Sequence, residues 1–390
     1  MRSVRAVVVA AVAACALALG ACAVGGEDRA GAPSATPGQR SPGDASQPPP
    51  GPDRASPDGA KPGRDGAGRD GDGRDEDGRG GDGGGGDSRG GAFARPPADD
   101  LWQPDRMARA RQPPHATAGG ARGGTDRIPE PVPARQVPRP YHRNMAPVGK
   151  VFFDRPEGPT VCSGTVVRDP AHPGASNLVW TAGHCVHGGA RGTWMRNIVF
   201  VPAYNDRSHP AERLADAPPA EVSPYGVWWA DWSQTSDGWL RYGGTGDERG
   251  SAYDFAVLHV RPKRGGASLE ETVGAAIPIW FGAPPAGRIS GVSAYGYPAA
   301  PPYDGARMFR CVGPPGRLAA ADGAPALYRV GCTMTGGASG GGWFVSRDGV
   351  TMLVSNSAIG STAHTWLAGP HLGSAAREVF DAVSQRFAER

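Results

Sequence analysis

The sequence predicts an all-β fold that contains a β-barrel and ends in one helix. Short apolar runs recur between residues 148 and 355, and each is bounded by Pro, Gly, Asn or Asp, as strands of all-β domains usually are. One helical stripe follows them, because Val379, Phe380, Val383 and Phe387 recur at helical spacing from Ser374 on. About 250 residues with this pattern suit a barrel protein with a closing helix.

The expected strands are short and rich in β-branched and aromatic residues, which favour a pleated, half-buried surface. In chain order they are Val148–Phe153, Thr160–Val167, Asn177–Thr181, Asn197–Val201, Phe255–Val260, Ile277–Phe281, Gly291–Tyr297, Leu327–Val330, Trp343–Val345 and Thr351–Ser355.

A targeting segment is predicted at the start of the chain. Arg2 and Arg5 precede an apolar run, Ala6 to Leu19, which is short for a membrane span and has the form of a secretory signal. The run ends in Leu-Gly-Ala-Cys22, which resembles a bacterial lipobox, in which the cysteine carries a lipid. Ordinary cleavage is the alternative. We therefore expect residues 1–22 to be a signal peptide with a lipobox, and the protein to be exported, either as a cell-surface lipoprotein or secreted.

Residues 23–140 are rich in Gly, Pro, Asp and Arg and poor in large apolar side chains. Such a composition cannot bury enough apolar surface to offset the entropy lost on ordering. We expect a disordered N-terminal segment, either a tether or a propeptide. The composition changes near Tyr141, so the folded domain is expected over residues 141–390.

Charge and cysteine content limit the function classes. The formal net charge of +3 is small for 390 residues and gives no reason to expect nucleic acid as a partner. Cys15 and Cys22 fall in the targeting segment, which leaves Cys162, Cys185, Cys311 and Cys332. Four cysteines in an exported chain imply two disulfides, for which three pairings are open.

One stretch, residues 331–344, places a single serine inside a cluster of glycines, with apolar runs on both sides. Glycine permits tight turns and close approach of the backbone to a ligand. A nucleophilic serine needs such a turn, because N–H groups aimed at one point stabilise the oxyanion that forms on attack. Ser339 is therefore a candidate nucleophile, and the N–H groups of Gly337 and Ser339 are candidate oxyanion donors.

A base and an acid precede this serine. His184 lies in Trp-Thr-Ala-Gly-His-Cys at the end of a predicted strand, and Asp254 lies at the head of another. A carboxylate beside a buried strand needs a partner, and an imidazole N–H is suitable. Asp231 and Asp247 are rival acids. His184, Asp254 and Ser339 together supply a base, an orienting acid and a nucleophile.

These motifs resemble the three signatures of the chymotrypsin/trypsin family, in the family's order: Thr-Ala-Gly-His184-Cys, then Asp254 before Phe-Ala-Val-Leu, then Gly-Ala-Ser339-Gly-Gly. The resemblance runs from about Val148 to the C-terminus. It implies two antiparallel six-stranded β-barrels with a C-terminal helix, and a serine endopeptidase that forms an acyl-enzyme. It also implies the bridges Cys162–Cys185 and Cys311–Cys332.

The chain departs from the family at two positions. Ala338 replaces the usual Asp that captures a freed N-terminus in zymogens, as in bacterial secreted relatives of the glutamyl endopeptidase type. Gly342 replaces the usual Pro.

The resemblance also suggests a substrate pocket formed by Thr333, Ser355, Asn356 and Ser357, with Thr333 near its floor and Ser355 bonded to Asp254. These residues are neutral, so specificity for Arg or Lys is not expected. Val354 replaces a histidine that would favour Glu, although His364 is a further candidate for the pocket.

Two alternatives compete with this interpretation. The Gly-x-Ser-x-Gly stretch also fits the nucleophile elbow of α/β-hydrolases, but there the acid and base follow the serine, and little chain remains after Ser339. The second alternative is an inactive, protease-like surface binding module. We expect protein or peptide substrates, a monomer, no cofactor or metal, no nucleic acid, and membrane contact only through a lipid on Cys22.

Overall fold

The computed structural model describes residues 90–93, 101–111, 116–117, 124–244 and 248–389. By its internal contacts the chain divides into Met1–Arg79 and Gly80–Arg390, and every described residue belongs to the second unit. The predicted signal peptide, its lipobox and Cys22 lie outside the described residues. Among the helices that the structure describes, none combines the length and the apolar character needed to cross a bilayer.

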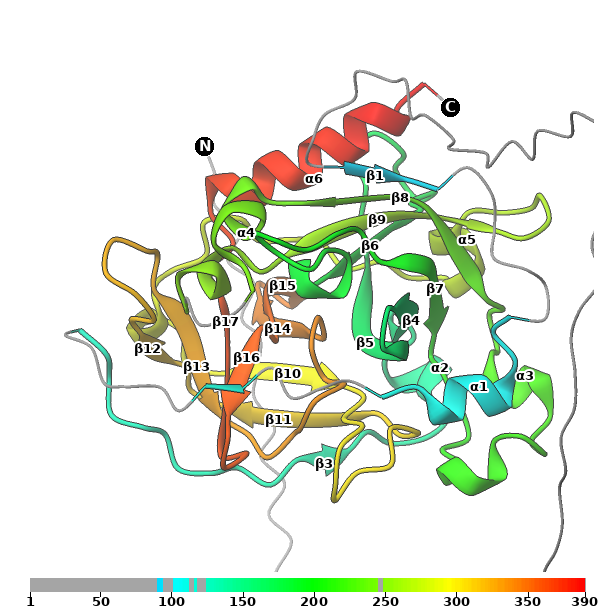
Figure 1. Ribbon diagram of the computed structural model, residues 1–390, viewed down its shortest axis with the longest axis horizontal. Coiled ribbons are helices and arrows are strands. Elements are labelled where there is room, and N and C mark those ends of the chain that lie inside the picture. The colour runs from blue at the N-terminus through cyan, green and yellow to red at the C-terminus, as the bar shows by residue number, and fades with distance from the viewer. Residues whose placement is uncertain (1–89, 94–100, 112–115, 118–123, 245–247, 390) are drawn as a thin grey trace, which may run out of the picture. The chain divides into compact units, whose positions relative to one another are not determined.

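The first barrel is a closed ring of six antiparallel strands (Figure 1). In ring order they are β4 (Val148–Arg155), β5 (Gly158–Val167), β6 (Leu178–Thr181), β9 (Ala256–Pro262), β8 (Trp228–Thr235) and β7 (Arg196–Pro202). The strands predicted in this half are confirmed, but β8 was missed. Its alternation is broken by a bulge between Ala230 and Trp232, which places Asp231 among the tryptophans.

The second barrel is built from two five-stranded sheets. One has the order β15 (Val350–Asn356), β14 (Gly342–Arg347), β10 (Val292–Gly296), β11 (Phe309–Gly313) and β3 (Arg135–Gln136). The other has the order β12 (Gly316–Leu318), β13 (Leu327–Gly331), β17 (Trp366–Pro370), β16 (Ile359–Ser361) and β2 (Ala116–Thr117). The predicted two-barrel fold is confirmed, although hydrogen bonds close only the first barrel into a single ring.

The predicted strand over Ile277–Phe281 is wrong. Ile277 makes one isolated bridge to Val167 of the first barrel, and Ile279 makes one to Leu353 of the second. Pro278 has no N–H to donate, which interrupts a ladder at this point. The apolar run is instead a connection that packs between the two barrels.

The predicted C-terminal helix is confirmed as α6 (Ser374–Phe387), which lies along β8 and β9 (Figure 1). Phe387 stacks on the His259 ring with centroids 3.6 Å apart, and Arg386 lies over the Trp232 ring. The other helices are a single turn or little more: α1 (Pro104–Arg109), α2 (Tyr141–Asn144), α3 (Pro219–Val222), α4 (Asp237–Tyr242), α5 (Leu269–Val273), and the 3₁₀ turns η1 (Gly183–Cys185), η2 (Ala211–Arg213), η3 (Glu248–Tyr253) and η4 (Ala286–Arg288).

Some described residues before Tyr141 are buried, so the prediction of a segment without a core needs correction for 101–111, whereas in 124–140 Val137 is buried and most residues are exposed. Trp102 and Met107 are buried, and the Trp102 ring lies 5.5 Å from that of Phe152. β1 (Gly90–Ala92) extends the first barrel beside β8, and β3 pairs with β11. A few large side chains in a polar segment suffice to dock it, because the barrels supply the rest of the apolar surface.

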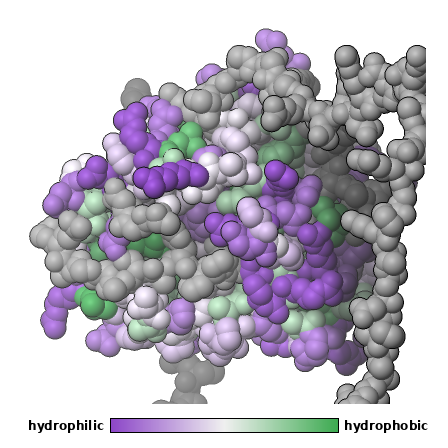
Figure 2. Space-filling view, in the orientation of Figure 1, coloured by the Kyte–Doolittle hydropathy of each residue, from purple (hydrophilic) through white to green (hydrophobic). Residues whose placement is uncertain are grey.

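The surface in Figure 2 agrees with this packing. On the face shown, the described residues are mainly polar, and apolar ones form small separate patches. The large apolar side chains that the described residues leave exposed are Ile128, Val312 and Val350. Trp102 and Met107, in contrast, belong to the buried core. Their removal should therefore lower the free energy of unfolding of the whole domain.

We predict that Trp102→Ala lowers the free energy of unfolding by about 3–5 kcal/mol, the usual cost of removing a buried aromatic ring. The indole also loses its hydrogen bond to the Asn197 carbonyl, 2.7 Å in length. Urea unfolding of the full chain measures the change. Ile128→Ala is the matched control, since Ile128 is 66% exposed and belongs to the same N-terminal region. Equal stability of both variants would show that residues 101–111 do not belong to the folding unit.

Candidate active site

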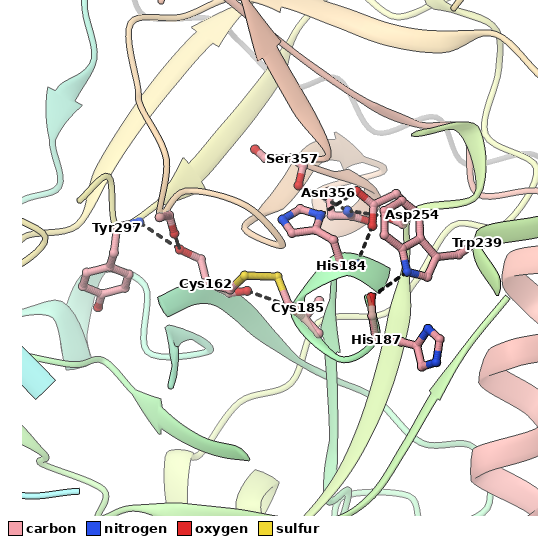
Figure 3. Close-up of a disulfide and its surroundings, with 12 residues drawn as sticks. Cys162, His184, Cys185, His187, Trp239, Asp254, Tyr297, Asn356 and Ser357 are labelled. Atoms are coloured by element: carbon pink, nitrogen blue, oxygen red, sulfur yellow. Dashed lines mark hydrogen bonds and ion pairs between the residues drawn. A yellow bond between two sulfur atoms is a disulfide. The ribbon is translucent and has the colours of Figure 1, made fainter. Parts of the chain in front are cut away.

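The geometry of His184 is set by a buried carboxylate. β6 leads into the 3₁₀ turn η1, which carries His184 at its centre. Its backbone N–H donates to Asp254 Oδ1 at 2.8 Å, and its Nδ1 lies 2.7 Å from Asp254 Oδ2 (Figure 3). An ionised carboxylate only accepts hydrogen bonds, so Nδ1 is the donor and the proton-accepting lone pair lies on Nε2. Asp254 therefore fixes both the position and the tautomer of the imidazole.

Of the two candidate acids that the structure describes, Asp254 contacts His184 and Asp231 does not. Asp254 is fully buried, and its carbonyl oxygen accepts a bond of 3.0 Å from the Asn356 side chain. Asp231 is engaged with His259, 2.5 Å from its Nδ1, and with Arg261. Asp247 lies outside the described residues. The two bonds from His184 give each oxygen of the Asp254 carboxylate a hydrogen-bond partner. A buried charge requires such partners.

Ser339 lies in the turn between β13 and β14, packed against the strand end that carries His184. Gly340 has φ 77°. A Cβ atom there would lie 2.2 Å from Thr181 Oγ1 and 2.9 Å from the Ala182 nitrogen. Only glycine allows the nucleophile turn to approach β6 this closely. The close contact places the Ser339 turn against the strand end that leads into η1, which carries His184.

Both predicted disulfide pairings are present. Cys162 on β5 bonds to Cys185 in η1, next to His184, and Cys311 on β11 bonds to Cys332 at the end of β13. His184 lies close to the first pair, but these sulfurs are bonded to each other, so no thiolate remains to hold a metal. The bridge ties η1 to β5, and two bridges are typical of a protein outside the reducing cytosol.

Comparison with solved structures gives the family. A thermostable serine protease from an extremophilic microorganism is 32% identical, and the match covers 62% of this chain and 97% of that one at a TM-score of 0.50. The chain belongs to the trypsin-like serine protease family. A protease from Arthrobacter nicotinovorans is 26% identical over 64% of this chain and 99% of its own, also at 0.50.

A Glu endopeptidase is 18% identical over 66% of this chain and 99% of its own, at a TM-score of 0.47. Comparisons with protein-family models and with curated proteins find no match.

Residues 335–337 carry the expected oxyanion donor Gly337, and we call them the oxyanion turn. Hydrogen bonds hold the backbone of this turn in place. The Gly336 carbonyl accepts from the Ala299 N–H at 2.6 Å, and the Gly337 carbonyl accepts from Ser163 Oγ at 2.9 Å. The C=O and N–H of a trans peptide point in opposite directions, so the Gly337 N–H points away from Ala299. Gly337 has φ 99°, a conformation that favours glycine.

A narrow cavity of about 20 Å³ opens beside Ser339. Of the four predicted pocket residues, Ser357 lines it and the other three do not. The residues around it include Thr335, Gly336, Gly360, Ser361 and His364. No Asp, Glu, Lys or Arg lines it within the part of the chain that the structure describes. The walls are therefore neutral apart from His364.

The three other predicted pocket residues have different partners. Thr333 bonds to the N-terminal segment, since its N–H donates to Val132 and its Oγ1 accepts from the Ala134 N–H. Ser355 Oγ donates to the Pro370 carbonyl at 2.8 Å rather than to Asp254. The Asn356 side chain links Trp180 Nε1 to Asp254 from within the core. The prediction erred on Thr333 because it placed no ordered chain before residue 141.

We predict that replacing Cys162 and Cys185 together with Ser costs about 2–5 kcal/mol of unfolding free energy, as loss of a native bridge in a small exported domain does. Because η1 is then tied only by hydrogen bonds, labelling of Ser339 by a fluorophosphonate should fall more than stability alone explains. The matched control is the double Ser variant at Cys311 and Cys332, which loses the second bridge and keeps the one next to His184. Equal losses of labelling at matched stability would contradict a specific role for Cys162–Cys185.

Proposed function

We propose that the chain is an exported serine endopeptidase, which cleaves peptide bonds through Ser339, His184 and Asp254. The observation that carries this proposal is the two-point contact of buried Asp254 with the backbone and ring of His184. This contact lies next to the turn of a Gly-flanked serine, because Gly340 packs against Thr181 and Ala182, which lead into η1. This arrangement is the one that activates a serine hydroxyl.

In the proposed reaction, Ser339 Oγ attacks the carbonyl carbon of the substrate while His184 Nε2 takes the hydroxyl proton. The imidazolium that forms is stabilised by Asp254. His184 then gives the proton to the leaving amine as the C–N bond breaks, and the acyl group stays on Ser339 as an ester. A water molecule, deprotonated by His184, attacks the ester carbon, and His184 returns that proton to Ser339 Oγ as the C–O bond breaks and the acid is released. The Gly337 and Ser339 N–H groups are proposed to bind the oxyanion in both steps.

The inactive binding module is the less supported alternative, because packing explains both departures from the family motif. Ala338 is buried in an apolar cluster of the second barrel, where an unpaired Asp would be costly. A Cβ at Gly342 would lie 2.5 Å from the Phe344 ring and 2.6 Å from Thr165 Oγ1. Neither residue therefore signals the loss of a catalytic group.

We further propose that the protein acts outside the cytoplasm as a monomer on protein or peptide substrates, held at the membrane by a lipid on Cys22. The two disulfides support export. No metal or cofactor has a part in the proposed steps.

We predict that Ser339→Ala abolishes both peptide hydrolysis and fluorophosphonate labelling, because the attacking oxygen is removed. Stability should stay within about 1 kcal/mol, as for most substitutions that leave packing intact. Hydrolysis of a casein or peptide-library substrate by the purified protein measures activity, and urea unfolding checks the fold. Thr335→Ser is the control, since it changes a hydroxyl residue of the same turn and keeps its oxygen. Undiminished hydrolysis by the Ser339→Ala protein would rule out this nucleophile.

We predict a preference for small or neutral residues before the cleaved bond. A cavity of about 20 Å³ with neutral walls cannot compensate the desolvation of a Lys or Arg side chain. His364, which lines the cavity, is the group that could pair with an acidic residue. A peptide-library cleavage profile tests both points. Preference for Arg or Lys would show that substrates occupy another pocket, whereas preference for Glu should disappear in His364→Ala with hydrolysis of neutral substrates retained.

A further inference from the structure

Two polar side chains of the first barrel lie beneath the nucleophile turn of the second. Lys150 on β4 and Ser163 on β5 are directly opposite each other in the antiparallel ladder, so their side chains project from the same face of the sheet. Lys150 is 2% exposed and Ser163 is fully buried. Buried polar groups need partners, and both find them in the second barrel.

Ser163 bonds to three backbone groups of the second barrel. Its Oγ donates to the Gly337 carbonyl and accepts from the Tyr297 N–H, each at 2.9 Å. Its backbone N–H donates to the Ser339 carbonyl at 2.7 Å. One residue of β5 thus contacts the oxyanion turn, the nucleophile itself and the end of β10.

Lys150 holds the far end of the loop that begins at Tyr297. Its Nζ donates to the Gly305 carbonyl at 2.6 Å and lies 4.9 Å from the ring centroids of Phe152 and Tyr204. We call residues 297–305, between β10 and β11, the 297–305 loop. The Gly305 N–H donates back to the Pro298 carbonyl, which closes the loop on itself. Lys150 and Ser163 therefore anchor its two ends to one face of the first barrel.

The 297–305 loop in turn holds the oxyanion turn. The Ala299 N–H donates to the Gly336 carbonyl at 2.6 Å, and Thr335 Oγ1 donates to the Ala300 carbonyl at 2.8 Å while accepting from the Ala300 N–H. The first bond sets the plane of the peptide that joins Gly336 and Gly337. Rotation of that peptide would move the Gly337 N–H, so the loop controls where this donor points.

Burial of the Lys150 amine costs free energy. The presence of a lysine at this position therefore points to a role that offsets the cost. Burial, assisted by the nearby charge of Arg111 and opposed by Asp304, lowers the pKa of Lys150 to about 7. An apolar side chain would fill the same space without this cost. The cost suggests that the bond to the 297–305 loop matters for function, since perturbed groups cluster at functional sites.

We propose that Lys150 is a positioning residue for catalysis: with Ser163 it clamps the 297–305 loop and so holds the oxyanion turn in its working conformation. This inference rests on the proposed serine endopeptidase function. In relatives that carry Asp at the position of Ala338, this Asp captures the freed N-terminus and so orders the oxyanion turn. In this chain, side chains of the first barrel would order that turn instead. Lys150 does not touch the substrate and acts through the loop.

Lys150→Met tests the clamp, because methionine fills much of the lysine volume and cannot donate to Gly305. We expect kcat to fall about 10- to 100-fold with KM nearly unchanged, somewhat less than loss of an oxyanion donor itself. The inhibition constant of a peptidyl aldehyde, which forms an oxyanion on binding, should rise in parallel, whereas that of the matching peptide amide should not. Hydrogen exchange of the Tyr297 and Ala299 amides should speed up without any substrate present.

Lys263→Met, a lysine beyond the end of β9, is the control and should change none of these values. If Lys150→Met does not fold, Ser163→Ala removes the other anchor and carries the same expectations. Unchanged exchange, kcat and aldehyde affinity in a folded Lys150→Met protein would overturn the clamp. If the wild-type protein hydrolyses nothing, the proposed function fails, but faster exchange confined to the 297–305 loop and to residues 335–337 would still support the clamp.

Discussion

The hydrogen bond from the Ser163 N–H to the Ser339 carbonyl joins the two halves of the candidate active site. His184 and Asp254 belong to the first barrel and Ser339 to the second, so their alignment depends on a rigid joint between barrels. The joint combines this bond with the contact of Gly340 against Thr181 and Ala182. The first joins two backbones, and the second sets the Gly340 backbone against the Ala182 nitrogen and the short Thr181 side chain. Neither involves a long flexible side chain, and alignment to within a fraction of an ångström is what proximity catalysis demands.

Burial of Asp254 has a second consequence besides orienting His184. Its carboxylate lies in a core that excludes water, where its attraction to a developing imidazolium is stronger than it would be in solvent. The same burial would be destabilising if the carboxylate lacked partners. The backbone N–H and ring of His184 provide these partners, so the group that would stabilise the imidazolium in the proposed reaction already has its hydrogen bonds without substrate.

The sequence was sufficient to predict the parts of the site that depend on local motifs. His184 and Ser339 were proposed from short stretches whose residue types suit the chemistry, and the strands flanking them followed from their apolar runs. The residues alone left three disulfide pairings open, and the resemblance to the trypsin family supplied the two that are present. The pocket could not be predicted in the same way. Thr333 lies at the expected spacing before Ser339, but its hydrogen bonds go to Val132 and Ala134. Spacing along the chain does not reveal which distant segment competes for a hydroxyl.

The same limit explains the errors in the fold. β8 was missed because a bulge at Asp231 breaks its period, and the strand over Ile277–Phe281 was wrong because its apolar residues serve two barrels at once. The packed residues before Tyr141 were missed because their own composition is too polar to form a core. Trp102 and Met107 become buried only against surface that the first barrel supplies. Tertiary context decided each of these cases.

Lys150 is another residue whose environment depends on tertiary context. In the sequence it stands in an apolar run, where a lysine indicates only that one position faces away from the core. The ladder shows instead that it shares a face with Ser163, and that this face is covered by the 297–305 loop. A charged residue in a strand that is buried on both sides requires a specific acceptor, and here the acceptor belongs to the loop that bonds to Gly336. Lys150 and Ser163 therefore place hydrogen bonds of fixed direction beneath the nucleophile turn, and these bonds orient a backbone that apolar packing alone would leave free to rotate.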